Sequence, residues 1–176
     1  MATDWATKAA GIGSIVIAVA AMLALGSLVD ARKMRHGQLF ADLSRRWDDE
    51  RTLESQKAFR AWGPGGTIKL IDELWGDPSK IPNPKDLDQW YELEIYPNLI
   101  ETIGVFLSEE IISEDMILKL WGPPIMDAWK EWREPVLHLR QVTHSCEDWR
   151  YFEAIGLRMA VLVADARTRV QSTHLP

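Results

Sequence analysis

Hydrophobic residues recur along most of the chain at the spacing of α-helices, and no segment alternates in the way a β-strand does. Leu39, Leu43 and Trp47 are each four residues apart, so they share one face of a helix. Two longer stripes repeat at steps of three or four residues: Ile125, Trp129, Trp132, Val136 and Leu139 form the first, and Trp149, Phe152, Gly156, Met159 and Val163 the second. The pattern predicts an all-α protein with these stripes in its core.

Polar caps and glycines predict where the first helices begin and end. Asp48 or Asp49 can cap a helix that runs to about Trp62, because an aspartate oxygen accepts from the free N–H groups at a helix start. The Gly-Pro-Gly-Gly sequence at 63–66 should stop this helix. Thr67 is then the predicted cap of a short helix that follows.

Prolines and glycines divide the second half of the chain in the same way. Pro97 should kink or split the helical pattern around it, because proline lacks the backbone N–H that a helix uses. Ser113 is the predicted cap of a helix closed at Gly122, with the next helix starting at Pro124. The last helix is expected to start at Ser145.

One segment differs from these amphipathic patterns because it is apolar on every side. Residues 9–29 form a run of 21 without a charged side chain, enough for a helix to cross about 30 Å of hydrocarbon. Lys8 is the one basic residue before it, whereas residues 30–47 directly after it hold five: Arg32, Lys33, Arg35, Arg45 and Arg46. The positive-inside rule then predicts a single-pass membrane protein, with its N-terminus outside and its C-terminal domain in the cytoplasm. We expect the five basic residues to contact lipid headgroups.

The domain organisation follows from this predicted span. It comprises a short extracytoplasmic N-terminus (1–8), a transmembrane helix (9–29), a basic juxtamembrane helix (30–48), a helical cytoplasmic domain (49–170) and a tail (171–176). Small residues at Ser14, Ala18, Ala21 and Gly26 offer a face for helix packing within the membrane, and the alternative is that they reflect the general abundance of small residues in membrane spans. Because the span holds no ionisable side chain, we expect it to anchor the protein and not to transport.

Charge and catalytic motifs exclude several classes of function. Acidic residues outnumber basic ones by 26 to 20, so a net charge of -6 argues against a nucleic-acid partner. His138 and His144 are six residues apart and would point in different directions on one helix, and Cys146 is the only cysteine. No second ligand pair and no catalytic motif accompany them. We therefore predict no metal, no cofactor, no small-molecule substrate and no enzymatic activity.

Nine tryptophans are more than a small core needs, and tryptophan is enriched at binding hot spots. Trp129, Trp132 and Trp149 lie on the two long predicted stripes, and we expect most of the nine in the core. Trp5, Trp47 and Trp90 are the predicted contacts with a partner, and ordinary packing is the alternative for each.

The order of these segments resembles a family of small bacterial, single-span, membrane-anchored proteins of unknown function. In that family a Leu-x-x-Asp-Leu-x-x-Arg-Trp stretch follows the anchor, and here it reads Leu39, Asp42, Leu43, Arg46 and Trp47. The resemblance covers residues 39–155. It implies an all-helical cytoplasmic domain and carries over no catalytic residues.

These features together predict a non-catalytic accessory or scaffolding subunit. It would be anchored in the bacterial inner membrane and stabilise a larger assembly of membrane proteins, for example a respiratory or photosynthetic one. The alternative is a membrane-tethered signalling or defence effector that responds to a cytoplasmic ligand, which would require an enclosed pocket with convergent polar groups.

Overall fold

The computed structural model describes Ser27, Ala31 and residues 34–173, with side chains placed as far as residue 169. Apart from Ser27, the predicted span at 9–29 lies outside the described residues. So do several predicted site residues: Trp5, Ser14, Ala18, Ala21, Gly26, Arg32 and Lys33. None of the helices in the described ranges combines the length and the apolar composition that crossing a membrane requires.

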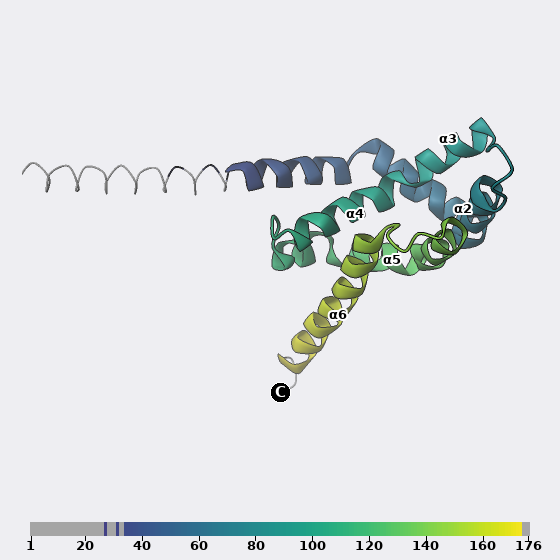
Figure 1. Ribbon diagram of the computed structural model, residues 1–176. Coiled ribbons are helices and arrows are strands. Elements are labelled where there is room, and N and C mark those ends of the chain that lie inside the picture. The colour runs from purple at the N-terminus through teal and green to yellow at the C-terminus, as the bar shows by residue number, and fades with distance from the viewer. Residues whose placement is uncertain (1–26, 28–30, 32–33, 174–176) are drawn as a thin grey trace, which may run out of the picture. The chain divides into compact units, whose positions relative to one another are not determined.

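The chain divides into two compact units, residues 1–41 and residues 42–176. In the first unit, residues 34–41 are helical. The second begins with the helical residues 42–47 and continues with five helices (Figure 1): α2 (Glu50–Trp75), α3 (Pro84–Leu93), α4 (Ile95–Ser108), α5 (Glu114–Thr143) and α6 (Arg150–Thr173). The described residues contain no strand, so the predicted all-α class is confirmed.

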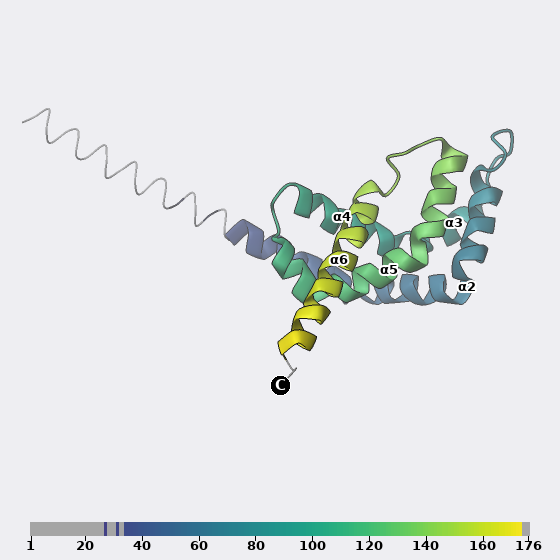
Figure 2. The same ribbon diagram turned by 90° about the horizontal axis from the view of Figure 1, so that it is seen from below.

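Helix α5 lies at the centre of the second unit, packed against α2 on one side and α6 on the other. Helix α4 packs against α6 and α2, and α3 packs against α2. Both views show the C-terminal part of α6 extending beyond the other helices (Figures 1 and 2). Residues 164–169 are accordingly all exposed.

The two predicted apolar stripes are buried, as their spacing required. All five residues of the α5 stripe are at most 6% exposed, and Ile125 and Val136 are completely buried. In the second stripe, Phe152 and Met159 are completely buried, and Gly156 packs against the side chain of Trp129. Leu43, from the first predicted stripe, is 2% exposed. The helical period therefore predicted the core correctly.

Helix α2 breaks at Gly63, as the Gly-Pro-Gly-Gly sequence predicted, but it resumes at once. Gly63 has φ 67° and ψ 173°, a conformation that strains any residue with a Cβ, and Pro64 restarts the helix. Thr67 was expected to cap the second part, and this is wrong because the helix already begins at Pro64. Its hydroxyl instead donates to the Gly63 carbonyl at 3.1 Å.

Pro97 splits α3 from α4 as predicted, and a serine from α2 bridges the break. Without an N–H on Pro97, the carbonyl of Leu93 loses its helical donor four residues on. The buried Ser55 hydroxyl donates to this carbonyl at 2.9 Å and accepts from the Tyr96 N–H at 3.2 Å. One side chain thus satisfies both backbone groups that the break exposes.

We expect Ser55→Ala to lower the free energy of unfolding by about 1–2 kcal/mol, because it leaves two backbone groups at the break without a partner. Denaturant titration followed by circular dichroism of the full chain in mild detergent measures the change. Ser108→Ala is the control, since Ser108 is an exposed serine at the end of α4. Equal effects of the two substitutions would contradict the bridging role.

Helix α5 begins as predicted but does not stop where predicted. The Ser113 side chain accepts from Met116 N at 3.4 Å, which confirms the cap. The expected end at Gly122 and new start at Pro124 are wrong, because α5 continues through both positions. The missing N–H groups of Pro123 and Pro124 would have bonded the carbonyls of two exposed residues, 119 and 120, which water can reach. Gly122 itself is buried against α6.

Helix α6 begins at Arg150, five residues later than the predicted start at Ser145. His144 ends α5 in the left-handed conformation with φ 55°, and Trp149 has φ 51°, so the chain between them is not helical. The first N–H groups of α6 are satisfied from α4, where the Glu101 carboxylate accepts from Phe152 N at 2.5 Å. This cap comes from a residue 51 positions away, so local sequence could not predict it.

Candidate functional site

Five aromatic side chains of the second unit form a continuous series of ring contacts, which we call the aromatic row. It runs from Trp75 through Trp90, Trp149 and Trp132 to Phe59, with ring centroids 5.0, 5.6, 5.6 and 4.1 Å apart. Edge-to-face and stacked contacts alternate along it, the two geometries that aromatic pairs prefer. Each end of the row borders a pocket.

The pocket at the Phe59 end, which we call the Trp47 pocket, has a volume of about 360 Å³. Four aromatic rings line it: Trp47, Phe59, Tyr96 and Trp132. The ring of Trp47 stacks on Trp121 at 5.5 Å and meets the edge of Tyr96 at the same distance. Because these rings come from residues 42–47, α2, α4 and α5, the packed fold holds the walls of the pocket in place.

Carboxylates give the Trp47 pocket a negative charge. Asp48, Asp127 and Glu131 line it, whereas Arg60 is its only basic residue. Arg60 Nε lies 3.8 Å from a Glu131 carboxylate oxygen, a loose pair between two solvent-accessible side chains that neutralises little. Burial raises the pKa of Tyr96 well above its usual value, and the negative charges of Glu131 and Asp127 add to the rise. Asp127 also pairs with Lys130 at 3.0 Å, so the three carboxylates outnumber the basic side chains beside them by one. An aromatic wall beside this excess of negative charge is suited to a cation.

The structure describes two of the three predicted contact tryptophans, Trp47 and Trp90, and each lines one of the two pockets. Trp47 is half-buried in the wall of its pocket, where a bound group could touch it. Trp90 is 5% exposed and lies inside the aromatic row, between Trp75 and Trp149. Partner contact through either residue stays a prediction.

Sequence reasoning missed the acidic residues of the Trp47 pocket. Asp127 and Glu131 are four residues apart on α5 and share one side of the helix, next to the buried Trp132. That spacing was the available signal. In the sequence alone, two acidic residues four positions apart are typical of an ordinary solvated helix face. Only the structure shows that residues of α2 and α4 line the same pocket.

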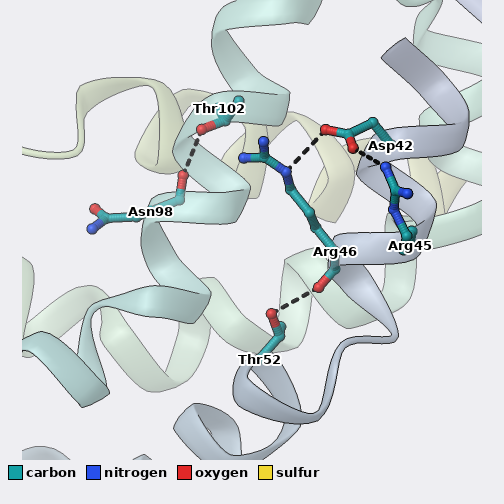
Figure 3. A network of polar contacts seen from close by, with 6 residues as sticks. All are labelled: Asp42, Arg45, Arg46, Thr52, Asn98 and Thr102. Atoms are coloured by element: carbon teal, nitrogen blue, oxygen red, sulfur yellow. Dashed lines mark hydrogen bonds and ion pairs between the residues drawn. The ribbon is translucent and has the colours of Figure 1, made fainter. Parts of the chain in front are cut away.

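The predicted lipid-binding arginines Arg45 and Arg46 are both paired with one carboxylate. Figure 3 shows Asp42 between the two guanidinium groups, with Arg46 Nε 3.0 Å from one carboxylate oxygen and Arg45 on the other. These ion pairs lower the pKa of Asp42, with the hydrogen bond from Arg45 as the largest cause. The guanidiniums are 77% and 63% exposed, so headgroup contact stays a prediction for them, as for the exposed Arg35.

Two hydrogen bonds between a threonine hydroxyl and a backbone carbonyl lie beside this ion-pair cluster. The Thr52 hydroxyl donates to the Arg46 carbonyl at 2.7 Å and joins residues 42–47 to the start of α2 (Figure 3). On α4, the Thr102 hydroxyl donates to the Asn98 carbonyl at 2.8 Å. The orientation of Trp47, which directly follows Arg46, therefore rests on a defined turn.

The histidine and cysteine residues considered above do not gather into one site. His138 Nε2 lies 2.7 Å from a carboxylate oxygen of Asp72 on α2. His144 is the exposed residue that ends α5, and Cys146 is exposed in the following loop. Across the part of the chain that the structure describes, no group of three or more ligand-type residues could hold a metal ion.

The second unit is thus an all-α domain built on a tryptophan-rich core with acidic, aromatic pockets at its surface. Residues 14–159 match the model of the family described as a domain of unknown function, DUF4760, and the chain belongs to that family. The match extends beyond the region 39–155 on which the resemblance rests, and it shows that the chain belongs to a family of unknown function. The bacterial origin and the membrane anchor stay predictions. No curated protein and no solved structure matches the chain.

Proposed function

We propose that this protein is a non-catalytic accessory subunit of a bacterial membrane assembly, which holds a basic side chain of a partner protein in the Trp47 pocket. One observation carries the proposal: three carboxylates and four aromatic rings surround a pocket of about 360 Å³ that contains a single arginine. A lysine or arginine side chain would gain both ion pairing and cation–π contact there.

The rim of the Trp47 pocket favours a protein partner over a small molecule. Asp48 and Asp127 are exposed, so the charge is available at the surface and can steer an approaching basic segment. Leu53 lines the same pocket and is 43% exposed, which offers an apolar contact beside the carboxylates. Interfaces combine buried aromatic anchors with a polar rim in this way.

Anchoring in the inner membrane is part of the proposal. Its support is the sequence of residues 9–29, which contains no charged side chain, and the excess of basic residues that follows. In this arrangement residues 42–173 lie in the cytoplasm, and the Trp47 pocket meets the cytoplasmic part of a neighbouring membrane protein.

Charge reversal in the pocket is expected to remove the partner. A tagged full chain, captured from gently solubilised native membranes, should co-purify with a membrane protein in stoichiometric amount, and Asp127→Lys should reduce that amount by about ten-fold or more. The reason is that a lysine at position 127 repels the basic side chain that the pocket holds. Quantitative mass spectrometry measures the ratio of partner to bait.

Asp115→Lys is a closely matched control. Asp115 lies on the same helix and pairs with Lys119, as Asp127 pairs with Lys130, but it does not line the pocket. We expect wild-type amounts of partner with this variant. The proposal fails if the wild-type chain purifies alone, or if Asp127→Lys retains the same partner in the same ratio.

A further inference from the structure

A second pocket, which we call the Trp90 pocket, lies at the other end of the aromatic row and has a volume of about 410 Å³. Three tryptophans of the row line it: Trp75, Trp90 and Trp149. It is formed by α2, α3, α4, the end of α5 and the loop before α6, and it shares no lining residue with the Trp47 pocket. The two pockets can therefore be tested separately.

All of the charged residues that line the Trp90 pocket are acidic: Glu94, Glu101, Glu147 and Asp148. Two arginines lie near the pocket. Arg140 pairs with Glu153 and donates to the Asp148 carbonyl, while its buried Nη2 has no hydrogen-bond partner among the described residues, and Arg150 pairs with Glu147. The Glu94 carboxyl group accepts hydrogen bonds from the side chains of Trp90 and Asn98, and neither of these donors carries a positive charge. The pocket therefore keeps an excess of negative charge beside three indole rings.

Glu94 and Glu101 are half-buried, and burial is the largest influence on each carboxyl group, raising the pKa of both. The Glu101 carboxylate already accepts a hydrogen bond from Phe152 N at the N-terminus of α6. Glu94 lies at the junction of α3 and α4, directly beside the tryptophan wall. A half-buried carboxylate without a cationic partner is costly, and a bound cation would offset that cost.

The arrangement of these carboxylates favours a bulky cation over a metal ion. In the described part of the chain, no three acidic, histidine or cysteine residues lie close enough to hold a metal. A cation that is bound by indole faces, with carboxylates at a distance, is typically a quaternary or alkylated ammonium group. The volume of the pocket is also far larger than one ion needs.

We propose that the Trp90 pocket binds a small organic cation with an alkylated ammonium head group. The half-buried Trp75 ring and the small exposed parts of Trp90 and Trp149 would contact the alkyl groups around the charge, and Glu94, which has no basic partner on its carboxyl group, would supply a negative charge beside them. Such a site would give the domain a ligand of its own, independent of the protein partner assigned to the Trp47 pocket.

The test uses choline chloride as the probe and its uncharged isostere 3,3-dimethyl-1-butanol as the control. The full chain in a maltoside detergent is titrated at constant ionic strength, and tryptophan fluorescence and calorimetry report binding. We expect saturable binding of choline and at least about ten-fold weaker binding of the neutral isostere, because the two differ only in charge. Equal responses to the two compounds, or no saturation by choline, would overturn the proposal.

Glu94→Gln removes the charge but keeps the shape, and it should weaken choline binding by about ten-fold without lowering the melting temperature. Glu92→Gln, in the last turn of α3 and outside the pocket, should bind as the wild type does. Wild-type binding should also weaken as the pH falls through the raised pKa values of Glu94 and Glu101, since protonation removes their charge. Unchanged binding by Glu94→Gln would contradict the site.

Discussion

Replacing Trp132 by alanine is expected to lower the free energy of unfolding by about 3–5 kcal/mol, the largest loss from any substitution considered for this protein. Trp132 is 1% exposed and connects the two ends of the aromatic row, since it stacks on Phe59 and meets Trp149 edge-to-face. Its removal opens a cavity between α5, α2 and the loop before α6. The neighbouring side chains cannot shift far enough to fill a cavity of this size.

Denaturant titration followed by far-ultraviolet circular dichroism of the full chain in mild detergent measures this loss, because that signal arises mainly from the helical backbone. Trp62→Ala is the matched control. Trp62 is 41% exposed at the kink of α2, and its substitution should change the free energy of unfolding by less than about 1 kcal/mol. If the two variants were equally stable, the aromatic row would not be the centre of the core.

Replacing Gly156 by alanine should be the second most damaging change, at about 2–3 kcal/mol. A Cβ at this position would lie 2.4 Å from Trp129 Cβ and 2.6 Å from its Cγ. These atoms are fixed close to the backbone of α5, so rotation of the Trp129 side chain cannot relieve the clash. Helices α5 and α6 would have to separate along their main contact.

Gly65→Ala provides a control with the opposite sign. Gly65 lies in the second part of α2, where an added Cβ meets no atom within 4 Å. Alanine should therefore stabilise the protein by about 0.5–1 kcal/mol, because it restricts the unfolded chain and favours the helix. Thermal unfolding of the two variants compares them directly. Similar shifts in melting temperature would mean that α5 and α6 do not pack closely at Gly156.

Most of the helical fold could be predicted from the sequence because it depends on local rules. The three-to-four-residue spacing of apolar side chains identified both long stripes of the core. Cap preferences placed the starts of α2 at Asp49 and of α5 at Ser113, since each side chain accepts from a backbone N–H one turn ahead or less. These features require only residues that are neighbours in sequence.

The errors arose where distant contacts outweigh local preference. Gly122 and the prolines after it predicted the end of a helix, but packing of Gly122 against α6 compensates for the two lost hydrogen bonds. The cap that Glu101 provides for α6, and the bridge that Ser55 provides between α3 and α4, come from 51 and 38 residues away. A single sequence gives no local signal for such pairs.

The acidic pockets could not be predicted for the same reason. Asp48 and Asp127 are 79 positions apart, and each read alone is an exposed aspartate near a helix. Only the packing of α2 against α5 brings them to one pocket with Trp47. The excess of tryptophan is visible in the sequence, but it could not indicate which of the aromatic side chains line a pocket.

The most direct test of the proposed function asks what lies over the Trp47 pocket in the cell. A photo-crosslinking amino acid at position 53, on the exposed rim, is activated in cells that produce the full chain, and the adduct is mapped by mass spectrometry. The same amino acid at position 69, on the far part of α2, is the control. We expect one membrane protein to be linked at position 53 alone, through a segment that contains lysine or arginine. Equal labelling at both positions, or an adduct on a segment without basic residues, would contradict a pocket that holds a basic side chain.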